Sequence, residues 1–216
     1  MNNLSLHHIT RPAKDTTKKA PLLLLLHGYG SNEEDLFSFA SELPQEYFIV
    51  SARAPFELQP TGHSWYDIHF TETEKVSNVK EAIVSRDTIA KFIDELIATY
   101  PIDANQINLL GFSQGTILSY AVALSYPEKI KNVVALSGYI NEEMLIDGYE
   151  NIDHNHLDFY ISHGSVDQVI PNFMANKAPD FLTKLNIKNS YREFPVGHGV
   201  APQNFYEFKE WLKNKL

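Results

Sequence analysis

The serine best suited to act as a nucleophile lies in the pentapeptide Gly111-Phe112-Ser113-Gln114-Gly115. This G-x-S-x-G pattern follows an apolar run and precedes a helical pattern, as in a tight strand-to-helix turn that exposes a serine hydroxyl. Glycine is needed at both ends because larger side chains would collide with neighbouring backbone. The turn also places the amide of Gln114 at a helix N-terminus, facing any oxyanion beside Ser113. We therefore predict Ser113 as the nucleophile and the Gln114 backbone N–H as one oxyanion donor.

A second glycine-rich turn, His27-Gly28-Tyr29-Gly30, follows a run of leucines and precedes a helical pattern. Glycine allows the backbone to approach a ligand closely, and an amide at this first crossover can supply the other oxyanion donor. We assign this donor to the backbone N–H of Tyr29. The alternative is a strand-end turn without a catalytic role. His27 itself is expected to organise the loop rather than to act as a base.

A serine needs a base to be nucleophilic at neutral pH, and the base needs an acid that fixes its tautomer. If the chain order is Ser, then Asp or Glu, then His, the base must be one of His154, His156, His163 and His198. The first two lie in a largely polar run typical of a solvated loop. His163 ends an expected strand, where a buried or turn-supporting histidine is commoner. His198, between the last expected strand and the last expected helix, is the best-placed base.

Asp167 is the preferred acid, because it lies in the turn His163-Gly164-Ser165-Val166-Asp167 after the fifth expected strand. Ser113 and His198 are expected at the same end of the sheet. Asp153 and Asp158 precede that strand and belong to the opposite end, and Asp180 lies within a helical pattern. The alternative role of Asp167 is to cap a turn or a helix.

Short apolar runs alternate with helical patterns along the chain. Five runs are mostly continuous in apolar residues rather than alternating, as strands buried on both faces of a parallel sheet are: 22–26, 47–51, 107–111, 133–137 and 159–162. A sixth run, 191–194, has a charged interior and suits a sheet edge. Helices are expected over 33–43, 79–100, 114–126, 172–185 with a kink or restart at Pro179, and 203–216. This alternation predicts an α/β fold, with a mainly parallel central sheet, helices on both faces and the chemistry at the carboxyl ends of the strands.

The composition predicts one soluble domain over residues 1–216, with 44% hydrophobic residues, 21% charged residues and no cysteine. The lack of cysteine excludes disulfides, thiolate metal sites and cysteine nucleophiles. A net charge of −9 opposes binding to nucleic acid. No run approaches the ~20 apolar residues of a membrane span, and the run 20–26 is at the lower limit for a secretory signal, so we expect a cytoplasmic protein. No cofactor or metal is expected, and whether the protein forms a homodimer is left open.

Five segments together resemble the phospholipase/carboxylesterase family of α/β-hydrolases, which includes bacterial carboxylesterases and acyl-protein thioesterases. They are HGYGSNEEDL at 27–36, the proline and SWYD segment at 55–67, GFSQG at 111–115, HGSVDQVIP at 163–171 and GHGV at 197–200. The resemblance implies the α/β-hydrolase fold, a triad of Ser113, Asp167 and His198, and an oxyanion hole from the amides of Tyr29 and Gln114. It also implies that the loop carrying Trp65 borders the acyl site. Tyr29 replaces an aliphatic residue and Ser31-Asn32 replaces an acidic one, which leaves the acyl specificity open.

The favoured function is a serine carboxylesterase that hydrolyses small-molecule esters of short to medium acyl chains through an acyl-enzyme. The expected length of the acyl chain depends on the stretch 54–77, whose prolines and aromatic rings, Trp65 among them, would shorten the acyl site. Alternatively, Trp65 and Tyr66 only anchor this stretch on the core. Two other functions remain open: an acyl-protein thioesterase or lysophospholipase that uses the same residues, and a catalytically silent ligand-binding module.

Overall fold

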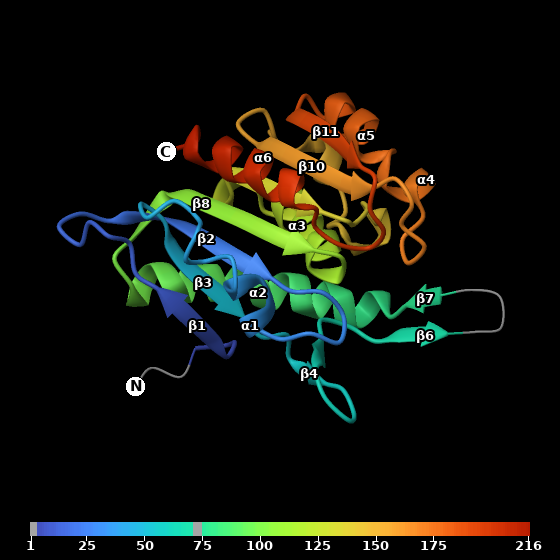
Figure 1. Ribbon diagram of the computed structural model, residues 1–216, viewed down its shortest axis with the longest axis horizontal. Helices are drawn as coiled ribbons and strands as arrows, with labels where there is room; N and C mark the ends of the chain where they lie inside the picture. The colour runs from blue at the N-terminus through green and yellow to red at the C-terminus, as the bar shows by residue number, and fades with distance from the viewer. Residues whose placement is uncertain (1–3, 71–74) are drawn as a thin grey trace.

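The computed structural model describes residues 4–70 and 75–216 and contains a central seven-stranded sheet (Figure 1). The strands lie in the order β1-β3-β2-β8-β9-β10-β11. Their bounds are β1 (His8–Arg11), β2 (Ala20–Leu26), β3 (Phe48–Ala52), β8 (Ile102–Phe112), β9 (Asn132–Leu136), β10 (Asp158–Gly164) and β11 (Lys188–Phe194). Every neighbouring pair is parallel except β1 and β3. The predicted mainly parallel sheet is confirmed, and the charged strand lies at an edge as expected.

The leucines of β2 show how both faces of the sheet are covered. Leu22, Leu24 and Leu26 pack on one face with residues of α2 (Val79–Thr99), α3 (Gln114–Ser125) and α5 (Ala178–Lys184). Leu23 and Leu25 pack on the other with α1 (Glu34–Phe37) and α6 (Pro202–Lys213). Alternate residues of a strand point to opposite faces, so a continuous leucine run fits a strand covered on both sides.

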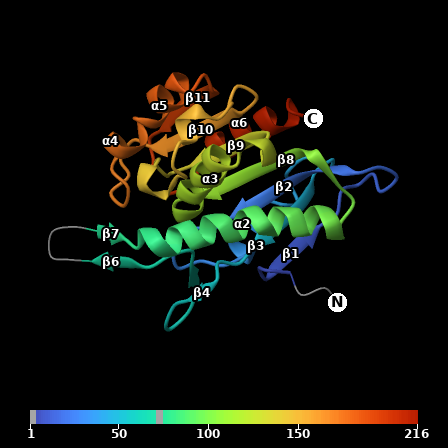
Figure 2. The same ribbon diagram turned by 180° about the vertical axis from the view of Figure 1, so that it is seen from behind.

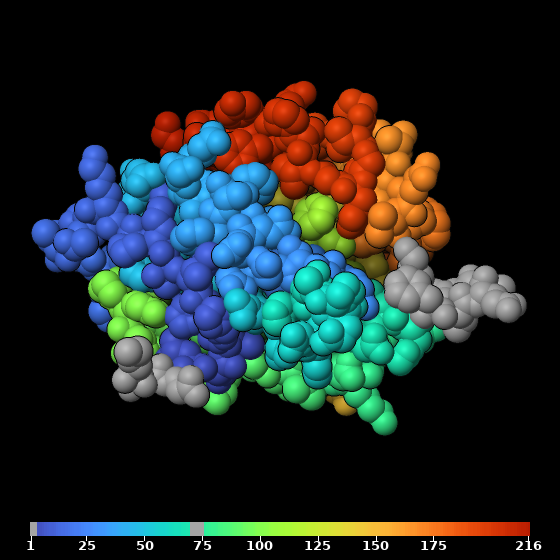
Figure 3. All heavy atoms as spheres, turned by 60° about the horizontal axis from the view of Figure 1, so that its bottom comes forward, coloured from blue at the N-terminus to red at the C-terminus, as the bar shows by residue number. Residues whose placement is uncertain are grey.

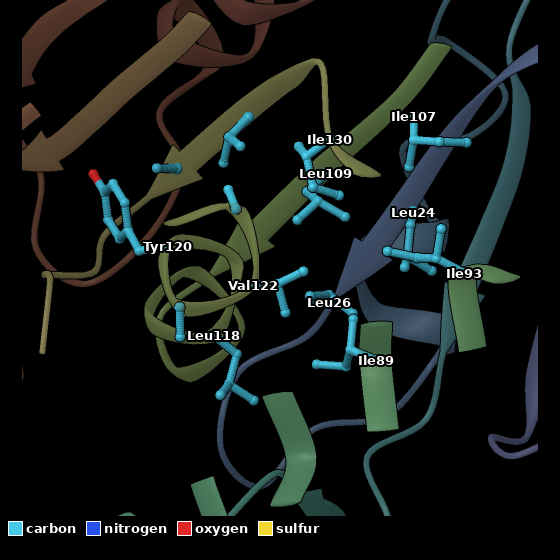
Figure 4. Close-up of a cluster of buried hydrophobic side chains, with 14 of the residues drawn as sticks. Leu24, Leu26, Ile89, Ile93, Ile107, Leu109, Leu118, Tyr120, Val122 and Ile130 are labelled. Carbon is cyan, nitrogen blue, oxygen red and sulfur yellow. The ribbon is translucent and has the colours of Figure 1, made fainter. Parts of the chain in front are cut away.

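The views from the two sides agree with this layering. The helix α6 lies over the sheet in Figure 1, and α2 and α3 lie over the opposite face in Figure 2. Figure 4 shows the α2 and α3 layer, in which Leu24 and Leu26 of β2 lie near Ile89 and Ile93 of α2 and Val122 of α3. The predicted helices on both faces are confirmed.

The helices differ from the predicted ones mainly at their ends. The side chain of Asn78 caps α2 by accepting a hydrogen bond from the Glu81 N–H at 3.3 Å. The expected helix 172–185 is two helices, α4 (Asn172–Ala175) and α5, and Pro179 lies in the first turn of α5, where a missing N–H is tolerated. The expected helix 33–43 ends at Phe37, after which bonds such as Ala40 N–H to the Phe37 carbonyl follow the tighter three-residue spacing.

In the part of the chain that the structure describes, three short 3₁₀ helices lie in the connections: η1 (Pro127–Lys129), η2 (Glu142–Met144) and η3 (Tyr149–Asn151). Within the described residues, none of the helices is both long enough and apolar enough to cross a membrane.

The stretch 54–77, expected as a long loop, contains two small hairpins. The strands β4 (Phe56–Glu57) and β5 (His63–Ser64) form one, and β6 (Ile68–Phe70) and β7 (Lys75–Ser77) form the other. Residues 71–74 of this stretch lie outside the described residues. A bridge between His63 and Ser31 joins the first hairpin to the turn after β2. This stretch therefore contacts the edge of the sheet where the chemistry is expected.

Candidate active site

Ser113 occupies the turn between β8 and α3 with a backbone φ of +54° and ψ of −116°. Its N–H donates to the carbonyl of Leu136 at 2.9 Å. The flanking glycines permit contacts that a side chain would prevent. A Cβ atom at Gly111 would lie 2.6 Å from the carbonyl oxygen of Gly115, and one at Gly115 would overlap the carbonyl of Leu26 in β2. The G-x-S-x-G pattern is therefore explained by the close packing of this turn on itself and on β2.

His198 and Asp167 form a hydrogen-bonded chain with Ser113. Nε2 of His198 is 2.9 Å from Oγ of Ser113, and its Nδ1 is 2.7 Å from Oδ2 of Asp167. Ser113 follows β8, Asp167 follows β10 and His198 follows β11, so the carboxyl ends of three strands bring the residues together. A neutral histidine that donates from Nδ1 to a carboxylate presents Nε2 as an acceptor to a hydroxyl. The arrangement can therefore deprotonate the serine.

The carboxylate of Asp167 is firmly held, and its side chain has no exposed surface. Its Oδ1 accepts hydrogen bonds from the N–H groups of Val169 at 2.8 Å and Ile170 at 3.0 Å, which leaves Oδ2 for His198. Burial by itself raises the pKa of Asp167, but the bonds from His198 and from the two amides outweigh it, so the pKa lies below its usual value. The group is therefore ionised at neutral pH and can fix the tautomer of the imidazole.

The turn after β2 approaches the serine closely. A Cβ atom at Gly28 would lie only 3.3 Å from the Cβ of Ser113. Among the described residues, the backbone N–H groups of Tyr29 and Gln114 donate to no protein acceptor. The strands β2 and β8 are neighbours, and the order of strands reverses between them, which is where sheets of this kind bind ligands. Two amides free to donate beside a hydroxyl can stabilise an oxyanion.

The space-filling view shows the same convergence. In Figure 3 a yellow-green part of the chain, around the end of β8, lies in a hollow bordered by blue, orange and red parts. These colours correspond to the segments that follow β2, β10 and β11. The segments that carry the predicted triad and the two predicted oxyanion amides therefore meet at one place on the surface.

Trp65 is fully buried and ties the stretch 54–77 to both turns. Its Nε1–H donates to the carbonyl of His27 at 2.9 Å, and its backbone N–H donates to Oε1 of Gln114 at 2.8 Å. Nε2 of Gln114 in turn donates to the carbonyl of Tyr66 at 2.8 Å. A side chain without exposed surface offers no contact area to a ligand in this conformation. The burial therefore favours the anchoring role of Trp65 over the expected place at the border of the acyl site.

The remaining histidines after Ser113 serve structural contacts. Nε2 of His163 is 2.8 Å from the carbonyl of Ile170 and 3.4 Å from Oδ2 of Asp167, so this ring supports the turn that carries the acid. The expectation of a solvated loop is wrong for His154, which is only 2% exposed and lies 3.0 Å from the carbonyl of Leu124 near the end of α3. The last carbonyls of a helix lack partners within it, and this ring satisfies one of them.

Two side chains contribute to the site in ways that the sequence alone does not indicate. The ring of Phe112 lies 5.0 Å from the ring of His198, centroid to centroid, and so helps to place the imidazole. The side chain of Gln114 links the nucleophile turn to the stretch 54–77, as described above. Their only signal is their place next to Ser113 in the motif. Within residues 4–70 and 75–216, no three His, Asp or Glu side chains gather as a metal site would require.

The chain is similar to known hydrolases over nearly its whole length. A model of the phospholipase/carboxylesterase family matches residues 8–216. A probable carboxylesterase of Oryza sativa is 26% identical over 94% of this chain and 81% of its own length. Acyl-protein thioesterase 1 of Saccharomyces cerevisiae is 26% identical over 100% of this chain and 99% of its own.

Solved structures show a similar backbone. The carboxylesterase of Bacillus cereus has a TM-score of 0.86 at 22% identity and covers 99% of this chain and 96% of its own. The carboxylesterase of Mesorhizobium loti has a TM-score of 0.83 at 19% identity and covers 99% and 97%. At these identities the likeness shows the fold, which is the α/β-hydrolase fold.

Proposed function

Because the chain belongs to the phospholipase/carboxylesterase family, and is therefore a hydrolase of the carboxylesterase and acyl-protein thioesterase type, we propose that it is a serine carboxylesterase. Ser113, His198 and Asp167 are its catalytic triad, and the amides of Tyr29 and Gln114 form its oxyanion hole. The observation that carries this proposal is the hydrogen-bonded chain of 2.9 Å and 2.7 Å from Ser113 through His198 to Asp167.

The first half of the reaction acylates the serine. Oγ of Ser113 attacks the ester carbonyl carbon while Nε2 of His198 takes the hydroxyl proton. The carbonyl oxygen becomes an oxyanion that accepts hydrogen bonds from Tyr29 and Gln114. When the tetrahedral intermediate collapses, the bond to the alcohol oxygen breaks and His198 returns the proton to the departing alkoxide. The alcohol leaves, and the acyl group stays on Ser113.

Water completes the cycle by the same steps in reverse. His198 removes a proton from a water molecule, whose oxygen attacks the acyl carbon, and the same two amides receive the new oxyanion. The bond to Oγ then breaks, the serine regains its proton from His198, and the carboxylic acid departs. Asp167 stays ionised throughout and stabilises the imidazolium that forms twice in each turnover.

Small apolar esters are the substrates that the surroundings of the triad favour. Val166 and Phe173, on either side of the Asp167 turn, are each 63% exposed. Val166 immediately precedes the proposed catalytic acid in the chain, and exposed apolar side chains can pack against an apolar ligand group. We propose short- to medium-chain acyl esters as substrates, with Val166 and Phe173 as contacts of the acyl chain.

A thioester substrate is the second candidate, because the thioesterase of Saccharomyces cerevisiae matches at the same 26% identity as the carboxylesterase of Oryza sativa. The same residues would attack a thioester carbonyl and release a thiol. Measuring kcat/KM for aryl esters of two to sixteen carbons beside acyl-CoA and lysophospholipid separates the candidates. A higher value for long-chain acyl-CoA than for every aryl ester would favour the thioesterase.

Covalent labelling tests the nucleophile directly. A fluorophosphonate should add one phosphonyl group to the wild-type protein, and Ser113→Ala should abolish both labelling and ester hydrolysis. Ser137→Ala is the matched control, since Ser137 also follows a strand of the sheet with a positive φ, of 52°. It should retain both properties. A phosphonyl adduct in the intact mass of Ser113→Ala would refute the assignment.

A further inference from the structure

The peptide unit between Gly28 and Tyr29 is held from one side by the ring of His27. Nδ1 of His27 lies 2.7 Å from the carbonyl oxygen of Gly28, and the N–H of Ser31 donates to the same oxygen at 3.3 Å. In a trans peptide the C=O and the following N–H point in opposite directions. A bond that fixes the Gly28 carbonyl therefore also fixes the direction of the Tyr29 N–H.

The second ring nitrogen of His27 shows where the ring proton lies. Nε2 is 3.1 Å from the backbone nitrogen of Ala54, whose N–H can only donate. Nε2 must therefore be an acceptor, and the proton of the neutral ring is on Nδ1, where it donates to Gly28. The ring has no exposed surface, and burial lowers the pKa of His27, which favours the neutral form. Its two nitrogens thus have fixed and opposite roles.

The rest of the turn is braced from outside by the stretch 54–77. The N–H of Gly30 donates to the carbonyl of His63 at 2.9 Å, and the N–H of His63 donates to the carbonyl of Ser31 at 2.8 Å. The carbonyl of His27 accepts from Trp65, whose ring lies 5.5 Å from the His27 ring. Between these fixed points, Gly28 has no Cβ atom, so its torsions are freer than those of its neighbours His27 and Tyr29. The ring of His27 acts at this freer point.

We propose that His27 is a positioning residue of the oxyanion hole. Its Nδ1–H holds the Gly28–Tyr29 peptide so that the Tyr29 N–H faces the carbonyl group attacked by Ser113. This inference rests on the proposed function and goes beyond it, because His27 acts through a peptide and touches no reacting atom. Without the bond, the peptide can turn about Gly28, and the oxyanion then keeps only the Gln114 donor.

Two substitutions separate the roles of the two nitrogens. In His27→Asn, the side-chain amide nitrogen can take the place of Nδ1 and donate to Gly28. In His27→Gln, the longer side chain reaches the place of Nε2 and can accept from Ala54, but Gly28 loses its donor. We expect His27→Gln to lower kcat about 10- to 100-fold with little change in KM, since losing a whole oxyanion donor costs about 10²–10³ in kcat. His27→Asn should stay within about fivefold of wild type.

An inhibitor distinguishes this role from a merely structural one. A trifluoromethyl ketone adds to the serine and forms an oxyanion, so its Ki should rise in His27→Gln by the same factor as kcat/KM falls. Fluorophosphonate titration counts the active sites, so that misfolded protein does not enter kcat. His154→Gln is the control, because His154 is also buried and bonded to a carbonyl, that of Leu124. It should lower stability but leave Ki unchanged.

Several outcomes would overturn the proposal. Equal kcat in His27→Asn and His27→Gln is one, and a fall in kcat without a rise in Ki is another. ¹⁵N NMR of the histidine rings in the wild-type protein needs no variant to fold, and a His27 proton on Nε2 would be decisive against it. If instead Ser113→Ala retained esterase activity, the proposed function would fail, while the tautomer measurement would still be informative.

Discussion

Replacing Asp167 with asparagine should leave the fold intact but reverse the tautomer of His198. The new amide oxygen can keep both bonds from the Val169 and Ile170 amides, at 2.8 Å and 3.0 Å in the wild type. The amide nitrogen then faces Nδ1 of His198 and donates to it, so the ring proton moves to Nε2 and faces Ser113. The opposite orientation of the amide would leave two buried N–H groups without acceptors, at about 1–3 kcal/mol each. The histidine is therefore held in the tautomer that cannot accept the serine proton.

The expected cost is about 10⁴ in kcat, or about 5.5 kcal/mol, as in other triads that lose the orienting carboxylate. The assay is kcat/KM for a four-carbon aryl ester, with urea unfolding to show that the variant is folded. Asp153→Asn is the control, since Asp153 is exposed, precedes β10 and accepts a hydrogen bond from the Asn155 N–H at 3.0 Å. It should change kcat/KM less than twofold. Equal losses in the two variants, or a loss below about 100-fold in folded Asp167→Asn, would refute the reasoning.

Three further outcomes are expected. A histidine base must be neutral to take the serine proton, so the rate should be higher in mildly alkaline than in mildly acidic buffer, and Asp167, whose pKa is lowered, should add no step in this range. A flat profile over the same range would contradict a histidine base. Trp65→Ala should cost about 3–5 kcal/mol in urea unfolding and leave the ratio of kcat/KM for four- and twelve-carbon esters unchanged; a shift toward the longer ester would restore Trp65 as a pocket wall. Hydrogen bonds from Arg53 lower the pKa of Glu33 to about 2, from 4.5, so Glu33→Gln should cost about 1–2 kcal/mol above pH 4.5, with allowance for the 36% exposure of Arg53. Because a lowered pKa stabilises the fold only while the group is ionised, that difference should shrink as the pH falls toward 2, and a Tm difference independent of pH would contradict it.

The buried strands could be predicted from the sequence because their signal is local. Runs such as 22–26 are apolar on both faces, and a parallel sheet covered by helices is the arrangement that buries both. The edge strand β1 has no such signal, since its four residues His8–Arg11 are all only partly buried and mix polar with apolar side chains. It forms because it can pair with β3, whose paired residues lie 38 to 44 positions further along the chain.

The same difference between local and long-range signals applies to the candidate site. Residues that directly follow strands could be placed from the sequence, because the carboxyl ends of parallel strands share one edge, and Ser113, Asp167 and His198 come within hydrogen-bond distance there. The surroundings of Trp65 could not, since they depend on a bond to Gln114, 49 residues away. For the same reason the burial of His154 under α3 has no trace in its polar neighbours.

The left-handed backbone of Ser113 lowers the stability of the fold at the position whose hydroxyl the proposed reaction needs. A residue with a Cβ atom in such a conformation costs of order 1–3 kcal/mol, which is a sizeable part of the 5–15 kcal/mol that typically keeps a domain folded. Glycine would adopt these torsions without that cost. Selection or engineering for heat resistance alone would therefore favour Ser113→Gly, and a library screened only for thermal survival would tend to enrich molecules that have lost the hydroxyl. Screens on this scaffold need turnover as a second criterion.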